Sequence, residues 1–150
     1  MSPDRKQPWV AEKRNFEFDT VQMPLNVMDA HFRSFGKEVL PVLVKKNIGV
    51  LGMKSMASGH ILANKTVSAI DCLHYALRLP TSVVITRVDR MAVPDQAFEA
   101  AKTFSKVSKE DLAAILEKTK PSALDGLFEP FKTSAIFDSA AAHPEWLGYM

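Results

Sequence analysis

Three short apolar runs, each followed by an amphipathic segment, limit most strongly what this chain can fold into. The runs are residues 20–25 (TVQMPL), 48–53 (IGVLGM) and 82–86 (SVVIT). Their starts lie about 30 residues apart, which is the length of a βαβ unit. Continuous apolar sequence, as opposed to strict alternation, is typical of parallel strands. The pattern therefore predicts an α/β fold with three consecutive strand-then-helix units.

Local end signals place the helices between and after these strands. Pro41 fits only in the first turn of its helix, and Asn47 is suited to close it. Ser68 and Ser108 each stand three residues before an aspartate, a spacing that favours a capped helix N-terminus. We expect helices over residues 37–46, 68–79, 93–102 and 108–118.

The third of these helices carries two further expectations. Asp89 is placed to cap its N-terminus, and Pro94 belongs in its opening turn. Helical spacing predicts that its buried side carries Ala97, Phe98 and Ala101.

The expected organisation is a polar lead-in over residues 1–15, three βα units over 16–104, and a C-terminal helix with an irregular tail over 105–150. Three strands are too few to close a barrel, since a (β/α)₈ barrel takes about 250 residues. Both outer strands would then keep unpaired backbone groups, which predicts self-association through the sheet edges.

Composition excludes several classes of protein. The 19 Lys and Arg against 17 Asp and Glu give a net charge of +2, which is too balanced for a nucleic-acid or polybasic membrane surface. No apolar run approaches the roughly 20 residues of a membrane span. We expect a cytoplasmic protein with no nucleic-acid or membrane partner. The chain has a single cysteine, Cys72, which we expect to be a reduced thiol because it has no partner for an internal disulfide. The four histidines lack metal-ligand spacing, so we expect no metal site.

Chemistry in parallel α/β folds is located at the C-terminal ends of the strands. The loop after the second run, residues 53–60 (MKSMASGH), combines a lysine with small residues that let backbone approach a ligand. Lys54 has two interpretations from sequence: a Schiff-base nucleophile, which requires desolvation, or an ion-pairing or substrate-facing lysine.

The loop after the third run places two arginines directly before a helix. A helix N-terminus favours anions, so Arg87 and Arg90 could bind phosphate there. The alternative is that they pair on the surface with Asp89 and Asp95. Both interpretations remain open on the sequence. The chain contains no Gly-x-Gly-x-x-Gly, P-loop or Gly-x-Ser-x-Gly motif.

Three segments occur in a characteristic order and spacing: 19–35 (DTVQMPLNVMDAHFRSF), 38–59 (EVLPVLVKKNIGVLGMKSMASG) and 71–86 (DCLHYALRLPTSVVIT). Together they resemble the last three βα units of an aldo/keto reductase. The resemblance covers residues 16–104 and continues through 131–148 (FKTSAIFDSAAAHPEWLG), which is similar to the tail of bacterial members. It implies the last portion of a (β/α)₈ TIM barrel and an NADP-dependent reduction of aldehydes or ketones.

The resemblance also implies roles for particular residues. Gln22 matches the glutamine that hydrogen-bonds the nicotinamide carboxamide, and Met53 stands where the family has an aromatic residue against the nicotinamide. The pyrophosphate loop corresponds to Lys54, Ser55, Met56 and Ala57, and the 2′-phosphate loop to Thr86, Arg87, Val88 and Asp89. The family's arginine and asparagine in the next helix are replaced here by Val93 and Ala97, which weakens the expected NADP contact.

The family's catalytic tyrosine, lysine, aspartate and histidine belong to the first half of the barrel, so no residue here inherits a catalytic role. One hypothesis is the cofactor-binding part of a carbonyl reductase, inactive alone and needing strands from another chain or from self-association. The other is a non-catalytic nucleotide-binding or interaction module, or a truncated gene product.

Overall fold

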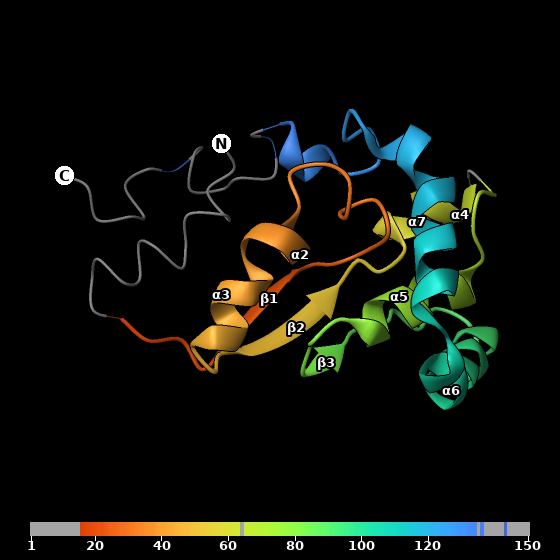
Figure 1. Ribbon diagram of the computed structural model, residues 1–150, viewed down its shortest axis with the longest axis horizontal. Helices are drawn as coiled ribbons and strands as arrows, with labels where there is room; N and C mark the ends of the chain where they lie inside the picture. The colour runs from red at the N-terminus through yellow and green to blue at the C-terminus, as the bar shows by residue number, and fades with distance from the viewer. Residues whose placement is uncertain (1–15, 64, 135, 137–142, 144–150) are drawn as a thin grey trace.

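The computed structural model describes residues 16–63, 65–134, 136 and 143, so the predicted lead-in over 1–15 lies outside the described residues. The described chain mixes helices with a three-stranded parallel sheet of order β1-β2-β3 (Figure 1). Strand β1 is Thr20–Pro24, β2 is Gly49–Met53, and β3 is Val83–Val84. The prediction of a parallel α/β fold is confirmed, although β3 is shorter than the predicted run.

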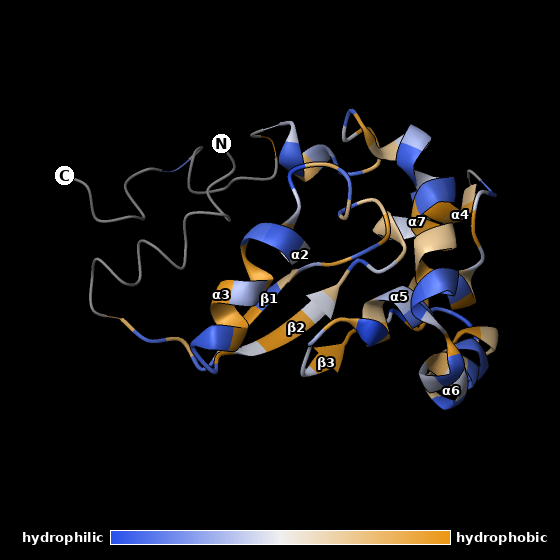
Figure 2. Cartoon of the chain, viewed as in Figure 1, coloured by the Kyte–Doolittle hydropathy of each residue, from blue (hydrophilic) through white to orange (hydrophobic). Residues whose placement is uncertain are grey.

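The sheet has one packed face and one open face. Met23 and Val50 are buried in a cluster with residues of the two helices that follow β1. Successive side chains of a strand point to opposite faces, so Leu51 and its neighbour across the ladder, Val83, lie on the other face, where Val83 is 50% exposed. Figure 2 shows β3 as an apolar strand at the edge of the sheet.

Two short helices replace the single helix predicted after β1. Helix α2 spans Phe35–Glu38 and α3 spans Leu40–Lys45, with Val39 between them. Pro41 lies in the first turn of α3, as expected. A proline ring clashes with the carbonyl four residues earlier, here that of Lys37, and disfavours a continuous helix. In this segment the break falls at Val39.

Capping boxes fix the starts of two of the predicted helices, α5 and α7. Helix α5 spans Ala69–Arg78, and α7 spans Lys109–Ala123. Ser68 and Ser108 each accept a hydrogen bond from the backbone N–H three residues later, and the aspartate there accepts from the serine N–H. Each such cap contributes about 1 kcal/mol, and both were predictable from the sequence.

Helix α7 continues beyond its predicted end and contains Pro121. Its last turns bury Thr119 and Ala123 against the core. We attribute the extension to this tertiary packing, because the sequence signal alone predicts an end before the proline.

The predicted cap and buried face of the third helix are wrong. Helix α6 spans Ala92–Thr103, begins after Met91 without a side-chain cap, and buries Ala100 instead. Phe98 is 65% exposed, and Ala97 is only half-buried. The helix packs on α5, which selects the Ala100 side and leaves the side with the larger apolar residue uncovered. Asp89 pairs with an arginine two residues earlier and does not cap.

Four short helical segments connect these elements. One pair follows β2, a third extends α6, and the last lies in the tail. They are η2 (Ala57–Gly59), α4 (His60–Ala63), η3 (Phe104–Lys106) and η4 (Pro130–Lys132).

Cys72 lies in the core and is fully buried. Burial, with a smaller contribution from the charge of Asp71, raises the pKa of its thiol to about 12. The thiolate is the nucleophilic form of cysteine, so the folded protein holds this thiol in an inert state.

We therefore expect Cys72 to react with a thiol-specific reagent at pH 8 only after unfolding, because the native thiol is inaccessible and protonated. Absorbance of the released chromophore measures the rate in native buffer and in denaturant. A native rate close to the denatured rate would contradict the buried position.

A buried ion-pair cluster attaches the tail to the loop after β1. The Nζ of Lys132 lies 2.6 Å from Oδ1 of Asp29 and 2.7 Å from Oε2 of Glu129, and it donates to the carbonyl of Phe32 at 2.9 Å. Asn26 donates to the other oxygen of Glu129 at 3.0 Å. Figure 1 shows η4 beside the loop between β1 and α2.

Lys132→Met should lower the free energy of unfolding by about 3–5 kcal/mol, because it leaves two carboxylates buried without their cation. Urea denaturation followed by circular dichroism measures the change. Lys118→Met, on the exposed side of α7, is the matched control and should change stability by less than about 0.5 kcal/mol. Equal effects of the two variants would exclude a stabilising role for the cluster.

Candidate functional site

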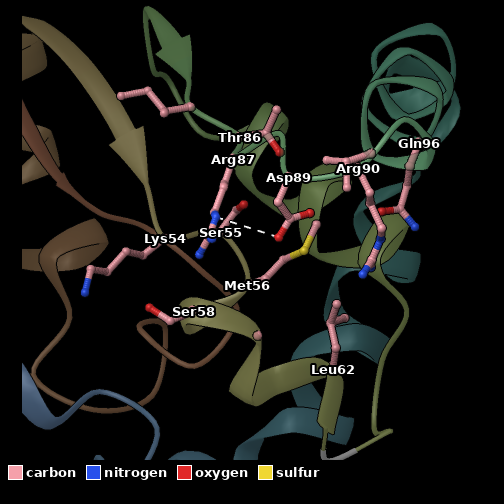
Figure 3. A pocket seen from close by; sticks show the side chains of 13 residues that line it. Lys54, Ser55, Met56, Ser58, Leu62, Thr86, Arg87, Asp89, Arg90 and Gln96 are labelled. Atoms are coloured by element: carbon pink, nitrogen blue, oxygen red, sulfur yellow. Dashed lines mark ion pairs between the residues drawn. The ribbon is translucent and has the colours of Figure 1, made fainter.

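A pocket of about 460 Å³ lies at the carboxyl ends of β2 and β3. One wall is the loop after β2, and the other is the loop after β3 together with the first turns of α6 (Figure 3). This is the edge at which the sequence places the candidate chemistry, because parallel strands bring their C-terminal loops together.

The pocket brings together most of the residues predicted to contact a cofactor. Val88 is exposed and does not line it. Gln22 and Met53 lie outside it as a separate pair, with Nε2 of the glutamine 2.8 Å from the methionine sulfur. The predicted residues that line the pocket are Lys54, Ser55, Met56, Thr86, Arg87 and Asp89.

The loop after β2 holds several residues in a left-handed backbone conformation. The φ angles are 53° at Lys54, 44° at Ala57 and 59° at Ser58, followed by 93° at Gly59. This conformation costs a non-glycine residue about 1–2 kcal/mol. Backbone strain of this kind is concentrated at functional sites. The strain therefore supports a binding role for the loop after β2.

Ser55 is the most buried polar residue among those that line the pocket. It is 5% exposed, and among the described residues its hydroxyl makes no hydrogen bond. An unsatisfied buried hydroxyl costs about 1–3 kcal/mol. Because Ser55 lines the pocket, a ligand oxygen bound there would recover this cost.

The cations on the other wall are weakly engaged. Nε of Arg87 lies 3.7 Å from Oδ2 of Asp89, with the arginine side chain 87% exposed. An exposed pair of this length contributes little. Arg90 lines the pocket and forms no ion pair within the described part of the chain, so the predicted pairing with Asp95 is not found. Both guanidinium groups remain available to an anion.

Lys54 extends away from Arg87 and Asp89 (Figure 3). Its Nζ lies 5.2 Å from the centre of the Phe131 ring, a cation–π contact with the tail. Lys54 is exposed, so it lacks the desolvation that activates a Schiff-base lysine.

Sequence reasoning missed Gln96 and Ser58, which also line the pocket. Gln96 follows Val93 by one helical turn, so a helical projection of α6 towards the β3 loop would have found it. Phe131 offers no comparable signal, since it is far from Lys54 in sequence. Among the described residues, no group of three or more His, Cys, Asp or Glu could hold a metal ion.

In comparisons with known proteins, no family model, no curated protein and no solved structure matches this chain. Within the described ranges, no helix has the length and apolar character needed to cross a membrane.

Ser58→Gly should raise the free energy of unfolding by about 0.5–1 kcal/mol, because glycine relieves the left-handed strain at this exposed position. Urea denaturation measures the change. Ser105→Gly is the control: this serine is exposed with a negative φ, so the substitution should destabilise by about 0.5–1 kcal/mol. If both variants change the free energy of unfolding in the same direction, the backbone at Ser58 is not strained.

Proposed function

We propose that this chain is the C-terminal, cofactor-binding portion of an NADP-dependent aldo/keto reductase, an oxidoreductase that transfers hydride to aldehydes or ketones. One observation carries the proposal: loops predicted separately to contact the pyrophosphate and the 2′-phosphate line one pocket, around the unpaired hydroxyl of Ser55.

The donors in this pocket fit phosphate oxygens. Arg87 and Arg90 offer guanidinium groups, which recognise phosphate bidentately. The hydroxyls of Ser55 and Thr86 add neutral donors. Val93, which replaces the family's arginine, presents only an apolar side chain to the pocket, so the two loop arginines must supply the charge recognition.

The nicotinamide end of the cofactor fits less completely. Gln22 carries an amide suited to the carboxamide, and Met53 offers a soft apolar surface beside it. When bound, NADPH supplies the hydride; these residues bind and orient it. No residue of this chain is assigned to proton transfer.

The open sheet explains why turnover needs more chain. Under this proposal β1, β2 and β3 are the last three strands of a (β/α)₈ TIM barrel, and the open face carrying Leu51 and Val83 is the barrel interior. Strands that complete such a barrel would pair with the edges of β1 and β3. A small carbonyl substrate would bind only in that completed form.

An interaction module is the second candidate, favoured by the exposed apolar side chains that accompany β3 and α6. Such a module would use the edge of β3 to add a partner strand. The side chains that favour it are Val83, Ile85, Val88, Met91 and Phe98.

Fluorescence titration with NADPH tests the proposal. Arg87→Gln should weaken NADPH binding by about tenfold or more, because a charge-assisted hydrogen bond contributes about 1.5–3 kcal/mol. The loss should be smaller for NADH, which lacks the 2′-phosphate. Ser55→Ala should weaken the binding of both NADPH and NADH.

Arg78→Gln, on an exposed arginine at the end of α5, is the matched control and should leave NADPH binding unchanged. The unmodified chain alone should show no turnover of an aldehyde. Absence of NADPH binding at millimolar concentration would reject the cofactor site and favour the interaction module.

A further inference from the structure

We propose that Phe131 is a positioning residue that holds Lys54 out of the nucleotide pocket and so limits the affinity of that pocket for polyanions. The inference rests on the proposed function and adds a control on the same site. The contact between Lys54 and Phe131 joins the C-terminal tail to a loop more than seventy residues earlier in the chain.

The position of the Lys54 side chain is the first observation. Its backbone belongs to the loop that lines the pocket, directly before Ser55, yet Nζ lies over the Phe131 ring at 5.2 Å. Figure 3 shows the side chain leading away from Arg87 and Asp89. The pocket therefore contains the base of this lysine without the benefit of its charge.

The fixed position of Phe131 is the second observation. Its ring stacks on that of buried Phe35, with 6.5 Å between centroids and 28° between planes. The next residue, Lys132, is buried and bonded to Asp29 and Glu129. The stacking on Phe35 and the ion pairs of the next residue fix the position of the Phe131 ring. The contact with this fixed ring therefore holds the Lys54 ammonium outside the pocket.

The contact between Lys54 and Phe131 is weak, so its loss should change the affinity by only a modest factor. An exposed cation–π contact changes an equilibrium by about two- to fivefold. The lysine stem is long and flexible, so its ammonium can reach a different anion once released. The contact therefore sets the affinity of the pocket and does not close it.

A double-mutant cycle on NADPH binding tests this. Phe131→Leu keeps an apolar contact with Phe35 and removes the ring face, so affinity should rise about two- to fivefold. Lys54→Met alone should have little effect, because the charge is already withheld. In the Phe131→Leu background, Lys54→Met should abolish the gain. Phe131→Tyr keeps a ring and should bind NADPH as the unmodified protein does.

Three comparisons separate this inference from a change in folding and from failure of the proposed function. Phe128 is a half-buried aromatic residue of the same tail that packs against the core cluster containing Cys72, so Phe128→Leu should not change the affinity. The gain in Phe131→Leu should shrink as salt is added, since it depends on an added charge. No binding by the unmodified protein would reject the proposed function itself; binding that Phe131→Leu leaves unchanged or weakens would overturn only the role of Phe131.

Discussion

The buried contact between Lys132 and Asp29 connects parts of the chain that are 103 residues apart in sequence. Leaving either group unpaired in this buried site would be costly, because an isolated buried charge is far less stable than a pair. Asp29 also accepts hydrogen bonds from the backbone N–H groups of Phe35 and Gly36 at the start of α2. The Asp29 carboxylate thus connects the loop after β1, helix α2 and the tail. The free-energy cost of leaving its charge unpaired keeps these three segments together.

This cluster also shows where sequence reasoning ends. The strands and the caps of α5 and α7 depend on neighbours within a few residues, so they were predictable from Ser68, Ser108 and the apolar runs. The buried face of α6 depends on its packing against α5, which helical spacing alone cannot select, so Phe98 was assigned to the wrong side. The pairing of Lys132 with Asp29 has no local signal at all.

The candidate site divides in the same way. The rule that parallel strands present their loops at one edge correctly placed the loops of Lys54 and Arg87 at one pocket. It did not indicate that Ser55 is buried without a partner, because burial is a property of the assembled fold. Nor did it indicate that Lys54 leaves the pocket for a tail aromatic, since that contact forms only when the ion-pair cluster places Phe131.

The pocket is built from the loops after β2 and β3, from α4 and from the first turns of α6, and no residue of β1 lines it. Under the proposed function, the phosphate groups of the cofactor would contact these loops, whereas the substrate and the proton donor would need the completed barrel. Cofactor binding and catalysis would then depend on different parts of the fold. Under the proposed function, the donors for the cofactor lie on the loops after β2 and β3 and not on the open face that carries Leu51 and Val83, so cofactor binding would not depend on strands that cover that face.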